Sequence, residues 1–211
     1  MQDPIGDAVK QLSDGWLVAY PTETVWGIGA DATSDEAIAR LRRWKRRGDD
    51  APFSILVPDL AALDALCCEV GEAARVLADA FWPGPVTLVV RCARDFAAGV
   101  RRSDGAVGVR CSAHPLAQAL ARRCDAEGTG PITSSSLNRS SAPPAASRAE
   151  AQRAVADGPD APRLLEVEGA EAGGQGASTV VDVTAGKPVV LRWGTLPAAE
   201  VEPVLARVAA P

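Results

Sequence analysis

The sequence contains one histidine, His114, among its 211 residues. A metal site built from several histidines is therefore excluded, and a Ser-His-Asp system could use only this side chain. Aromatic residues make up 4% of the chain, which argues against a platform that stacks the bases of single-stranded nucleic acid. The chemistry of this protein must rest on other polar side chains.

Long hydrophobic runs are also missing. The longest apolar stretches, such as VTLVV at 86–90, have the length of a strand, whereas a membrane-spanning helix needs about 20 apolar residues. The N-terminal stretch MQDPIGDAVKQL carries two acidic residues and lacks the apolar centre of a signal peptide. We therefore expect a cytoplasmic protein that makes no membrane contact.

The five cysteines lack the C-x-x-C spacing of many metal sites, because Cys67 and Cys68 are adjacent and Cys92, Cys111 and Cys124 stand apart. This spacing predicts neither a bound metal nor a framework of disulfides. Small, buried, free cysteines in a reducing compartment are the expectation.

The composition is that of an ordinary globular protein, with 47% hydrophobic and 23% charged residues. Expected strands and helices alternate without an internal repeat, and no long linker divides the chain. This order predicts an α/β fold in a single domain over 1–211, with some antiparallel pairing near the C-terminal end.

Hydrophobic periodicity places the individual elements. The expected strands are 16–20, 53–57, 86–90, 106–110, the short PIT at 131–133, and a hairpin of 178–183 with 188–194. The expected helices are 33–44, two segments near 59–67 and 72–80, then 114–124, 147–156 and 198–208. In the 33–44 helix, Thr33 and Glu36 match a capping box, and Gly48 is expected to end the helix.

The stretch GIGADA at 27–32 matches the G-x-G-x-x-A fingerprint of dinucleotide-binding folds. That motif begins where a strand ends, whereas PTETVW separates Gly27 from the preceding strand. The G-x-x-x-x-G-K-[ST] motif of a Walker loop does not occur either. A nucleotide bound by this protein would have to be held by other groups.

Five polar segments border the expected strands, where α/β sheets bind their ligands. They are PTET at 21–24, Arg110-Cys111-Ser112, the serine run TSSSLNRSS at 133–141, Ser178-Thr179 and Arg192. Any one of them alone is typical of an ordinary turn or cap. Together their hydroxyl groups and arginines indicate a pocket for phosphate and carboxylate groups.

Basic residues are concentrated in RLRRWKRR at 40–47, although the net charge of the chain is −5. A dense basic cluster on an acidic protein favours a local anion site over a general nucleic-acid surface. A solvated helix face is the alternative interpretation of such a charge run.

Six motifs occur in a fixed order: YPTETVWGIGADA, WKRRGDDAPFSILV, WPGPVTLVV, VGVRCSAHPLA, PITSSSLNRSS and STVVDVTAGKPVVLRWG. In this order the chain resembles the YrdC-like threonylcarbamoyl-AMP synthases over about residues 14–196. The resemblance implies an α/β fold with a twisted, open, mixed sheet, flanking helices and a central basic cavity. It also implies a nucleotidyltransferase that condenses L-threonine, bicarbonate or carbon dioxide, and ATP into threonylcarbamoyl-AMP and releases pyrophosphate.

The same resemblance implies a place in tRNA processing, since the product feeds the threonylcarbamoyl modification of the adenosine next to the anticodon. The implied partners are ATP, L-threonine, bicarbonate and the enzymes that transfer the threonylcarbamoyl group, with tRNA itself as a contact to test. Mg²⁺ is expected to arrive with ATP, because it is commonly bound through substrate phosphates, and no protein metal site is expected.

The resemblance assigns roles to individual residues, position by position. The threonine side is expected to consist of Thr22, Thr24, Arg110, Ser134 and Ser178. The ATP side is expected to consist of Lys45, Arg47, Ser136, Asn138 and Arg192. Lys45 and Arg47, which match the K-x-R pair of the family, are the catalytic candidates because their charges would stabilise the phosphates.

The chain departs from the family pattern at Gly48, Ala51, Leu137, Ser141 and Trp193. These departures concern the identity of the substrate more than the fold, and they leave two alternatives open. One alternative is a related enzyme of the same fold that handles other carbamoyl adenylates. A second is a non-catalytic RNA-binding module that uses the basic helix, against which the acidic net charge and the few aromatic residues argue.

Overall fold

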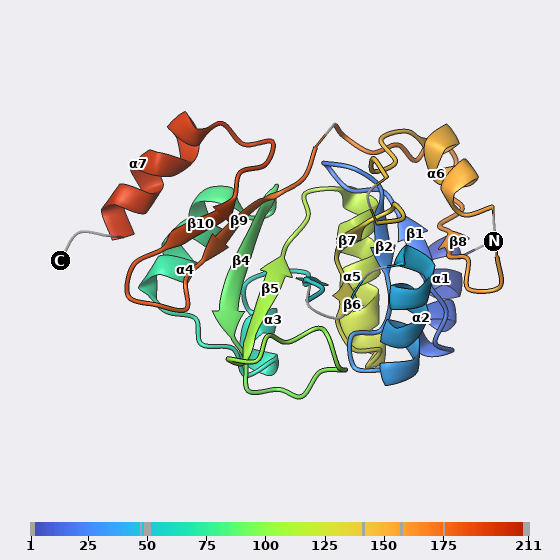
Figure 1. Ribbon diagram of the computed structural model, residues 1–211, viewed down its shortest axis with the longest axis horizontal. Helices are drawn as coiled ribbons and strands as arrows, with labels where there is room; N and C mark the ends of the chain where they lie inside the picture. The colour runs from blue at the N-terminus through green and yellow to red at the C-terminus, as the bar shows by residue number, and fades with distance from the viewer. Residues whose placement is uncertain are drawn as a thin grey trace.

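The computed structural model describes residues 3–46, 48, 52–140, 142–156, 158–174 and 176–208. Its strands form two mixed sheets (Figure 1). In spatial order the larger sheet contains β10 (Val189–Arg192), β9 (Thr179–Asp182), β4 (Val86–Arg91), β5 (Ala106–Arg110), β3 (Ile55–Leu56) and β6 (Ile132–Thr133). The smaller contains β7 (Ser135–Ser136), β2 (Gly27–Gly29), β1 (Val18–Tyr20) and β8 (Arg163–Leu164). The predicted α/β class is confirmed, but the strands divide into two sheets where one was expected.

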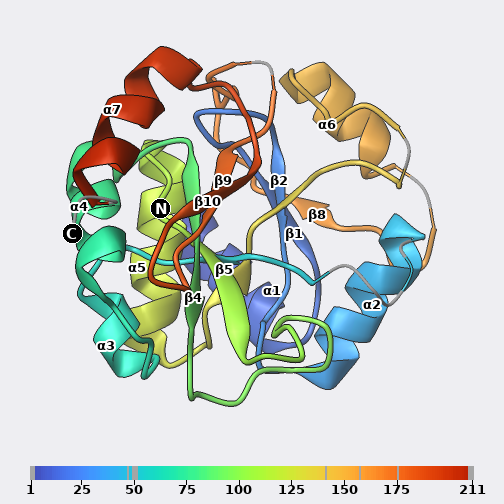
Figure 2. The same ribbon diagram turned by 60° about the vertical axis from the view of Figure 1, so that its left-hand side comes forward.

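Helices flank these strands on both sides. They are α1 (Pro4–Ser13), α2 (Asp35–Lys45), α3 (Ala62–Ala65), α4 (Glu72–Phe81), α5 (Pro115–Glu127), α6 (Arg148–Ala154) and α7 (Ala198–Val208). Figure 2 shows α3, α4, α5 and α7 on one side of the strands and α2 and α6 on the other. No helix in the described ranges combines the length and the apolar character that crossing a membrane requires.

The predicted strand at 86–90 is β4, an inner strand of the larger sheet. It pairs in parallel with β9 and antiparallel with β5, and Val86, Leu88 and Val90 are at most 1% exposed. Burial on both faces explains why this segment is an uninterrupted apolar run rather than an alternating one. Thr87 is the polar exception, and it is also buried.

The glycines of GIGADA serve the packing of Tyr20. Gly27 and Gly29 lie in β2, which pairs with β1, and a Cβ on them would approach the Tyr20 ring to 3.0 and 3.2 Å. The Tyr20 hydroxyl donates a hydrogen bond to the carbonyl of Thr133 at 3.0 Å. As the sequence predicted, this segment is not a dinucleotide-binding turn.

The capping box predicted for α2 is wrong by one residue. Ser34, and not Thr33, caps the helix, since its Oγ accepts a hydrogen bond from the backbone N–H of Ala37 at 3.2 Å. The helix ends at Lys45, one residue beyond the predicted range, and its C-terminal cap is Arg46, with a left-handed φ of 53°, and not the predicted Gly48.

The serine run connects the two sheets. Its first residue, Thr133, is the last residue of β6 at one edge of the larger sheet, and after Ser134 the chain forms β7 at one edge of the smaller sheet. The backbone N–H of Thr133 donates to Ala30 at 2.8 Å, and that of Ser134 donates to Ser54 at 2.6 Å. A segment bonded on both sides in this way is not a flexible linker.

The cysteines differ from the sequence prediction. Cys68 and Cys92 form a disulfide across an isolated antiparallel bridge, so the expectation of free cysteines is wrong for this pair. Their separation of 24 positions carries no sequence signal, because only the packing of the segment after α3 against the end of β4 brings them together. Cys67 is free and exposed, whereas Cys111 and Cys124 are free and buried.

This arrangement predicts the reactivity of the thiols. Burial raises the pKa of Cys111, and it raises the pKa of Cys124 to about 12, so neither forms the reactive thiolate near neutral pH. Iodoacetamide without reductant should add one group to the folded protein, three after unfolding in urea, and five once a reductant is added. Intact-mass measurement counts the adducts, and Cys67→Ser should show none when folded. A first adduct on Cys124 would contradict the burial.

Candidate functional site

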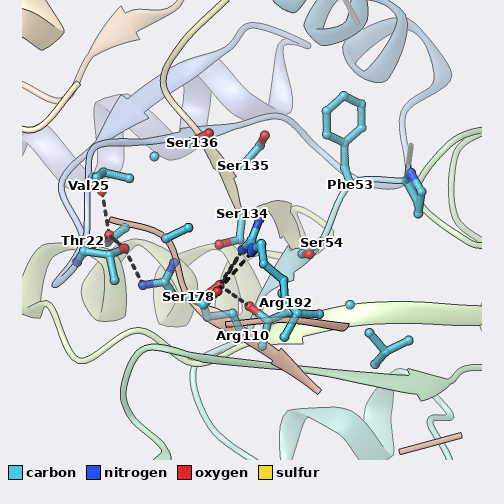
Figure 3. Close-up of a pocket in the computed structure, with 18 of the residues that line it drawn as sticks. Thr22, Val25, Phe53, Ser54, Arg110, Ser134, Ser135, Ser136, Ser178 and Arg192 are labelled. Atoms are coloured by element: carbon cyan, nitrogen blue, oxygen red, sulfur yellow. Dashed lines mark hydrogen bonds between the residues drawn. The ribbon is translucent and has the colours of Figure 1, made fainter. Parts of the chain in front are cut away.

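A cavity of about 290 Å³ is lined by residues from both sheets. Figure 3 shows the serine run on one side of it and Arg110 and Arg192 on the other. Seven of the ten residues predicted for the site line this cavity: Thr22, Thr24, Arg110, Ser134, Ser136, Ser178 and Arg192. Tertiary folding therefore brings together four of the five polar segments that the sequence placed beside separate strands, together with the first residues of the fifth.

The other three predicted residues lie elsewhere. Asn138 lines a neighbouring cavity of about 590 Å³, which shares Val25 with the first. Lys45 is not among the residues that line either cavity. Arg47 lies outside the described residues, as do the two departures Ala51 and Ser141.

The PTET turn has its hydroxyl groups bonded to one another. The Thr22 hydroxyl donates to the carbonyl of Val25 at 2.6 Å and accepts from the backbone N–H of Thr24 at 3.2 Å. The two threonine hydroxyl oxygens are 2.9 Å apart. Because the Thr22 proton is already used, the Thr24 hydroxyl donates to Thr22. The turn therefore offers hydrogen-bond acceptors to a ligand, and not hydroxyl donors.

Arg110, at the end of β5, is the buried cation beside this turn. Its Nη2 donates to the Thr24 hydroxyl at 2.7 Å and to the Oε1 of Glu23 at 2.8 Å. The hydroxyl of Ser112 donates to the other Glu23 oxygen. Burial opposes ionisation of Glu23, but the charge of Arg110 and these hydrogen bonds outweigh it and lower the pKa of the carboxyl. The two side chains thus form a charged pair.

Arg192 is positioned by Ser178 at the start of β9. Its Nη2 donates to the Ser178 carbonyl at 2.9 Å, and the Ser178 hydroxyl is 2.8 Å from that of Thr87. Burial, and then the positive charge of Arg110, lower the pKa of Arg192. Two guanidinium groups near each other in one cavity favour the binding of an anion between or beside them.

Lys45 holds the serine run in place by hydrogen bonds from its ammonium group. Its side chain is 3% exposed, and its ammonium donates to the carbonyl of Ser136 at 2.5 Å and to the carbonyl and Oδ1 of Asn138 at 3.1 Å each. The Asn138 Oδ1 also accepts from the Ser136 hydroxyl at 2.6 Å. The predicted phosphate ligand is therefore also the anchor of the predicted nucleotide loop.

Leu137 explains one departure from the family pattern. Its side chain is fully buried in the hydrophobic core, between the two loop residues that Lys45 holds. Arg139 continues the attachment, since its guanidinium lies over the Trp44 ring at 4.4 Å. The larger side chain thus fixes the serine run to the core instead of filling the cavity.

Three cavity-lining polar residues were not singled out by the sequence analysis: Ser54, Thr87 and Arg102. Ser54 and Thr87 carry a weak signal, because each is a polar residue inside an apolar strand segment. Arg102 carries none. Its pKa is raised by Asp104 and Asp182, whose carboxylates it contacts, so its charge is balanced within the protein.

The donor set around the cavity is suited to anions and not to a metal ion. Its lining contains no carboxylate, and no group of three or more histidine, cysteine, aspartate or glutamate residues in the described part of the chain could hold a metal ion. Guanidinium, hydroxyl and backbone groups are what carboxylates and phosphates bind. The arrangement can orient an anionic substrate and stabilise charge that develops on it.

Comparisons with known proteins agree with this chemistry. The family model described as "Telomere recombination", of the Sua5, YciO and YrdC proteins, matches residues 10–194. A threonylcarbamoyl-AMP synthase of Chromohalobacter salexigens is 42% identical over 193 residues, which are 88% of this chain and 95% of the relative.

Two solved structures are similar in fold and sequence. Sua5 of Pyrococcus abyssi, solved in complex with L-threonine, has a TM-score of 0.85 and 33% identity; the match covers 97% of this chain and 58% of that one. YciO of Escherichia coli has a TM-score of 0.77 and 25% identity, over 93% of this chain and 91% of that one. This chain thus spans little more than half the length of the Pyrococcus protein.

Proposed function

Because this chain belongs to the Sua5/YciO/YrdC family, we propose that it is a threonylcarbamoyl-AMP synthase, which condenses L-threonine, bicarbonate or carbon dioxide, and ATP. The observation that carries the proposal is the convergence on one cavity of seven predicted residues, two of them arginines and five of them residues with hydroxyl groups. An amino-acid carboxylate and a phosphate both need such donors.

The proposed reaction mainly requires that the protein position its reactants. The amine of threonine attacks carbon dioxide to give a carbamate and a proton, a carbamate oxygen then attacks the α-phosphate of ATP, and pyrophosphate leaves. Arg110 would hold the threonine carboxylate, and acceptors of the PTET turn would face its N–H or O–H groups. Holding reactants in attack geometry supplies up to about 7–11 kcal/mol of a barrier.

Charge stabilisation would come from other cationic residues. Arg192 lines the cavity beside Arg110, and Ser136 brings the serine run to its edge. Negative charge that builds on the phosphates in the transition state would be stabilised by Arg192 and by the K-x-R pair, Lys45 and Arg47. Lys45 would act through the serine run that it holds, in addition to its charge.

The single histidine is bonded in a way that suits a structural role. The Nδ1 of His114 accepts from the backbone N–H of Leu116 at 3.2 Å, which leaves Nε2 to donate to the carbonyl of Glu171 at 3.0 Å. Both ring nitrogens are engaged, so His114 caps α5 and is not assigned an acid–base step.

The remaining reactants and partners follow from the proposed chemistry. Mg²⁺ would be carried by the phosphates of ATP, since the cavity lining offers no carboxylate ligand. The threonylcarbamoyl group would pass to tRNA through separate transfer enzymes, and direct contact with tRNA is part of the proposal to be tested. The cytoplasm is the proposed location, where a disulfide such as Cys68–Cys92 is exposed to reductants.

Omitting the substrates one at a time tests the proposal. Pyrophosphate release from Mg²⁺-ATP should require both L-threonine and bicarbonate, and omission of either should reduce it to the level without enzyme. Equal release with L-serine, or without any amino acid, would indicate a related enzyme for other carbamoyl adenylates. Salt-sensitive RNA binding without any ATP turnover would indicate an RNA-binding module instead.

A further inference from the structure

Glu23 is a partly buried carboxylate for which the proposed function provides no role. It stands between the two threonines of the PTET turn, yet it is not among the residues that line the cavity. Its side chain is 18% exposed, its Oε1 is 2.8 Å from Nη2 of Arg110, and its Oε2 accepts from Ser112. A carboxylate of the protein thus already binds the arginine that is proposed to bind the carboxylate of the substrate.

The pairing with Glu23 prevents Arg110 from making a two-point contact with a ligand carboxylate. Nη2 carries two hydrogens, and both are used, one by Glu23 and one by the Thr24 hydroxyl. A guanidinium binds a carboxylate by two parallel bonds along an edge, either Nη1–Nη2 or Nε–Nη2, and both edges include Nη2. A ligand carboxylate can therefore make the two-point contact only after Glu23 or Thr24 has released this nitrogen. The Nε of Arg110 is buried and has no partner among the described residues.

Thr24 is the less favourable group to release, because of its other bonds. Its hydroxyl donates to Thr22, and it belongs to a turn that is closed by the Thr22–Val25 hydrogen bond. The turn is also covered, since the backbone N–H groups of Gly173 and Gly174 donate to the carbonyls of Thr22 and Thr24 at 2.9 and 3.0 Å. The end of the Glu23 side chain, in contrast, accepts side-chain hydrogen bonds from Ser112 and Arg110.

The charges near Arg110 determine which ligand can replace Glu23. Arg110 and Arg192 are close enough for their charges to interact, and Glu23 balances one of the two. A plain carboxylate that approaches meets the negative charge of Glu23, whereas an α-amino acid also brings an amine that the acceptors of Thr24 and Glu23 attract. Loss of the Glu23 charge would therefore strengthen the binding of a carboxylate without an amine more than the binding of an α-amino acid, because removal of this charge does not improve the contacts of the amine.

We propose that Glu23 is a specificity-determining residue that competes with the ligand carboxylate for Nη2 of Arg110 and thereby restricts the site to α-amino acids. The inference rests on the proposed function, because that function assigns an amino-acid carboxylate to Arg110. Ser112 supports the competition by holding Glu23 against the arginine.

The test compares L-threonine with 3-hydroxybutyrate, which is threonine without its α-amine. Both are titrated calorimetrically into the wild-type protein and into Glu23→Gln. The variant should bind 3-hydroxybutyrate at least 10-fold more tightly than the wild type does, and its preference for threonine over 3-hydroxybutyrate should fall at least 5-fold. Ser112→Ala keeps the charge but loosens Glu23, so it should shift the preference in the same direction by a smaller factor.

The control is Glu127→Gln, which removes the carboxylate of another glutamate–arginine pair, with Arg123 near the end of α5. It should leave both affinities unchanged. An unchanged preference in Glu23→Gln, or weaker binding of both ligands, would overturn the competition. If Glu23→Gln does not fold, an unchanged preference in Ser112→Ala overturns it. If the wild type binds neither ligand, the proposed function falls and this inference with it.

Discussion

Replacement of Lys45 by alanine should lower the free energy of unfolding by about 3 kcal/mol and reduce pyrophosphate release at least ~100-fold. The ammonium is buried and donates to three oxygen atoms of the serine run, on Ser136 and Asn138. Hydrogen bonds to a charged group contribute about 1.5–3 kcal/mol each, and buried acceptors left without a partner cost about 1–3 kcal/mol. Alanine would therefore release the loop as well as remove a charge.

Denaturant unfolding and calorimetric titration separate these two effects of Lys45. Arg43→Ala is the matched control, because Arg43 lies on the same helix, is 57% exposed and pairs with Asp160 at the surface. Arg43→Ala should lower the free energy of unfolding by less than about 1 kcal/mol. If Lys45→Ala were as stable as the wild type, bound threonine normally and lost only ATP affinity, the anchoring role would be wrong and a role at the phosphates alone would be right.

Replacement of Arg110 by alanine should weaken threonine binding about 100-fold and change ATP affinity by less than about twofold, because two charged hydrogen bonds to one carboxylate are lost. Arg110→Lys should restore little of the affinity, since an ammonium cannot make the planar two-point contact. The alanine variant also leaves the partly buried carboxylate of Glu23 without its cation, so it should be less stable than the wild type.

The double variant Arg110→Ala/Glu23→Gln distinguishes binding from stability. It should regain most of the lost stability, because the unpaired charge is gone, but none of the threonine affinity. Titration with threonine and with Mg²⁺-ATP, together with denaturant unfolding of all four proteins of the cycle, measures both quantities. Normal threonine affinity in Arg110→Ala would refute the carboxylate assignment, and so would an equal loss of ATP affinity.

Several elements with strong local patterns were predicted well, although α1 was missed despite the cap residue Asp3 and the initial Pro4. The strand at 106–110 and the helix at 198–208 were predicted with the bounds that the structure has, and the hairpin of β9 and β10 was also predicted. Their apolar periodicity and turn residues lie within a few positions of each other, so the sequence carries the signal directly. The two-residue strands β7 and β8 were missed, because so short a segment shows no periodicity and forms only where a partner strand is already present.

Seven of the ten residues predicted for the site line one cavity, but the hydrogen bonds between them were not predicted. Arg110, Arg192 and the first serines of the run were recognised as polar groups beside strands, and they line one cavity. The pairing of Arg110 with Glu23 was not predicted, since 87 positions separate them. The packing of β5 against the PTET turn brings these two residues together. Because they are far apart in the sequence, no local sequence pattern indicates the pairing.

By itself the sequence determined the α/β class, the placing of hydroxyl groups and arginines beside strands, and the family to which the chain belongs, because each of these depends on residue type and local order. Only the tertiary structure decided what those groups bind. It divided the strands into two sheets joined by the serine run, placed the ammonium of Lys45 under that run, paired Glu23 with Arg110, and joined Cys68 to Cys92. The physical reason is that burial removes water as a partner, so each buried polar group must bond to whichever group the fold brings near it.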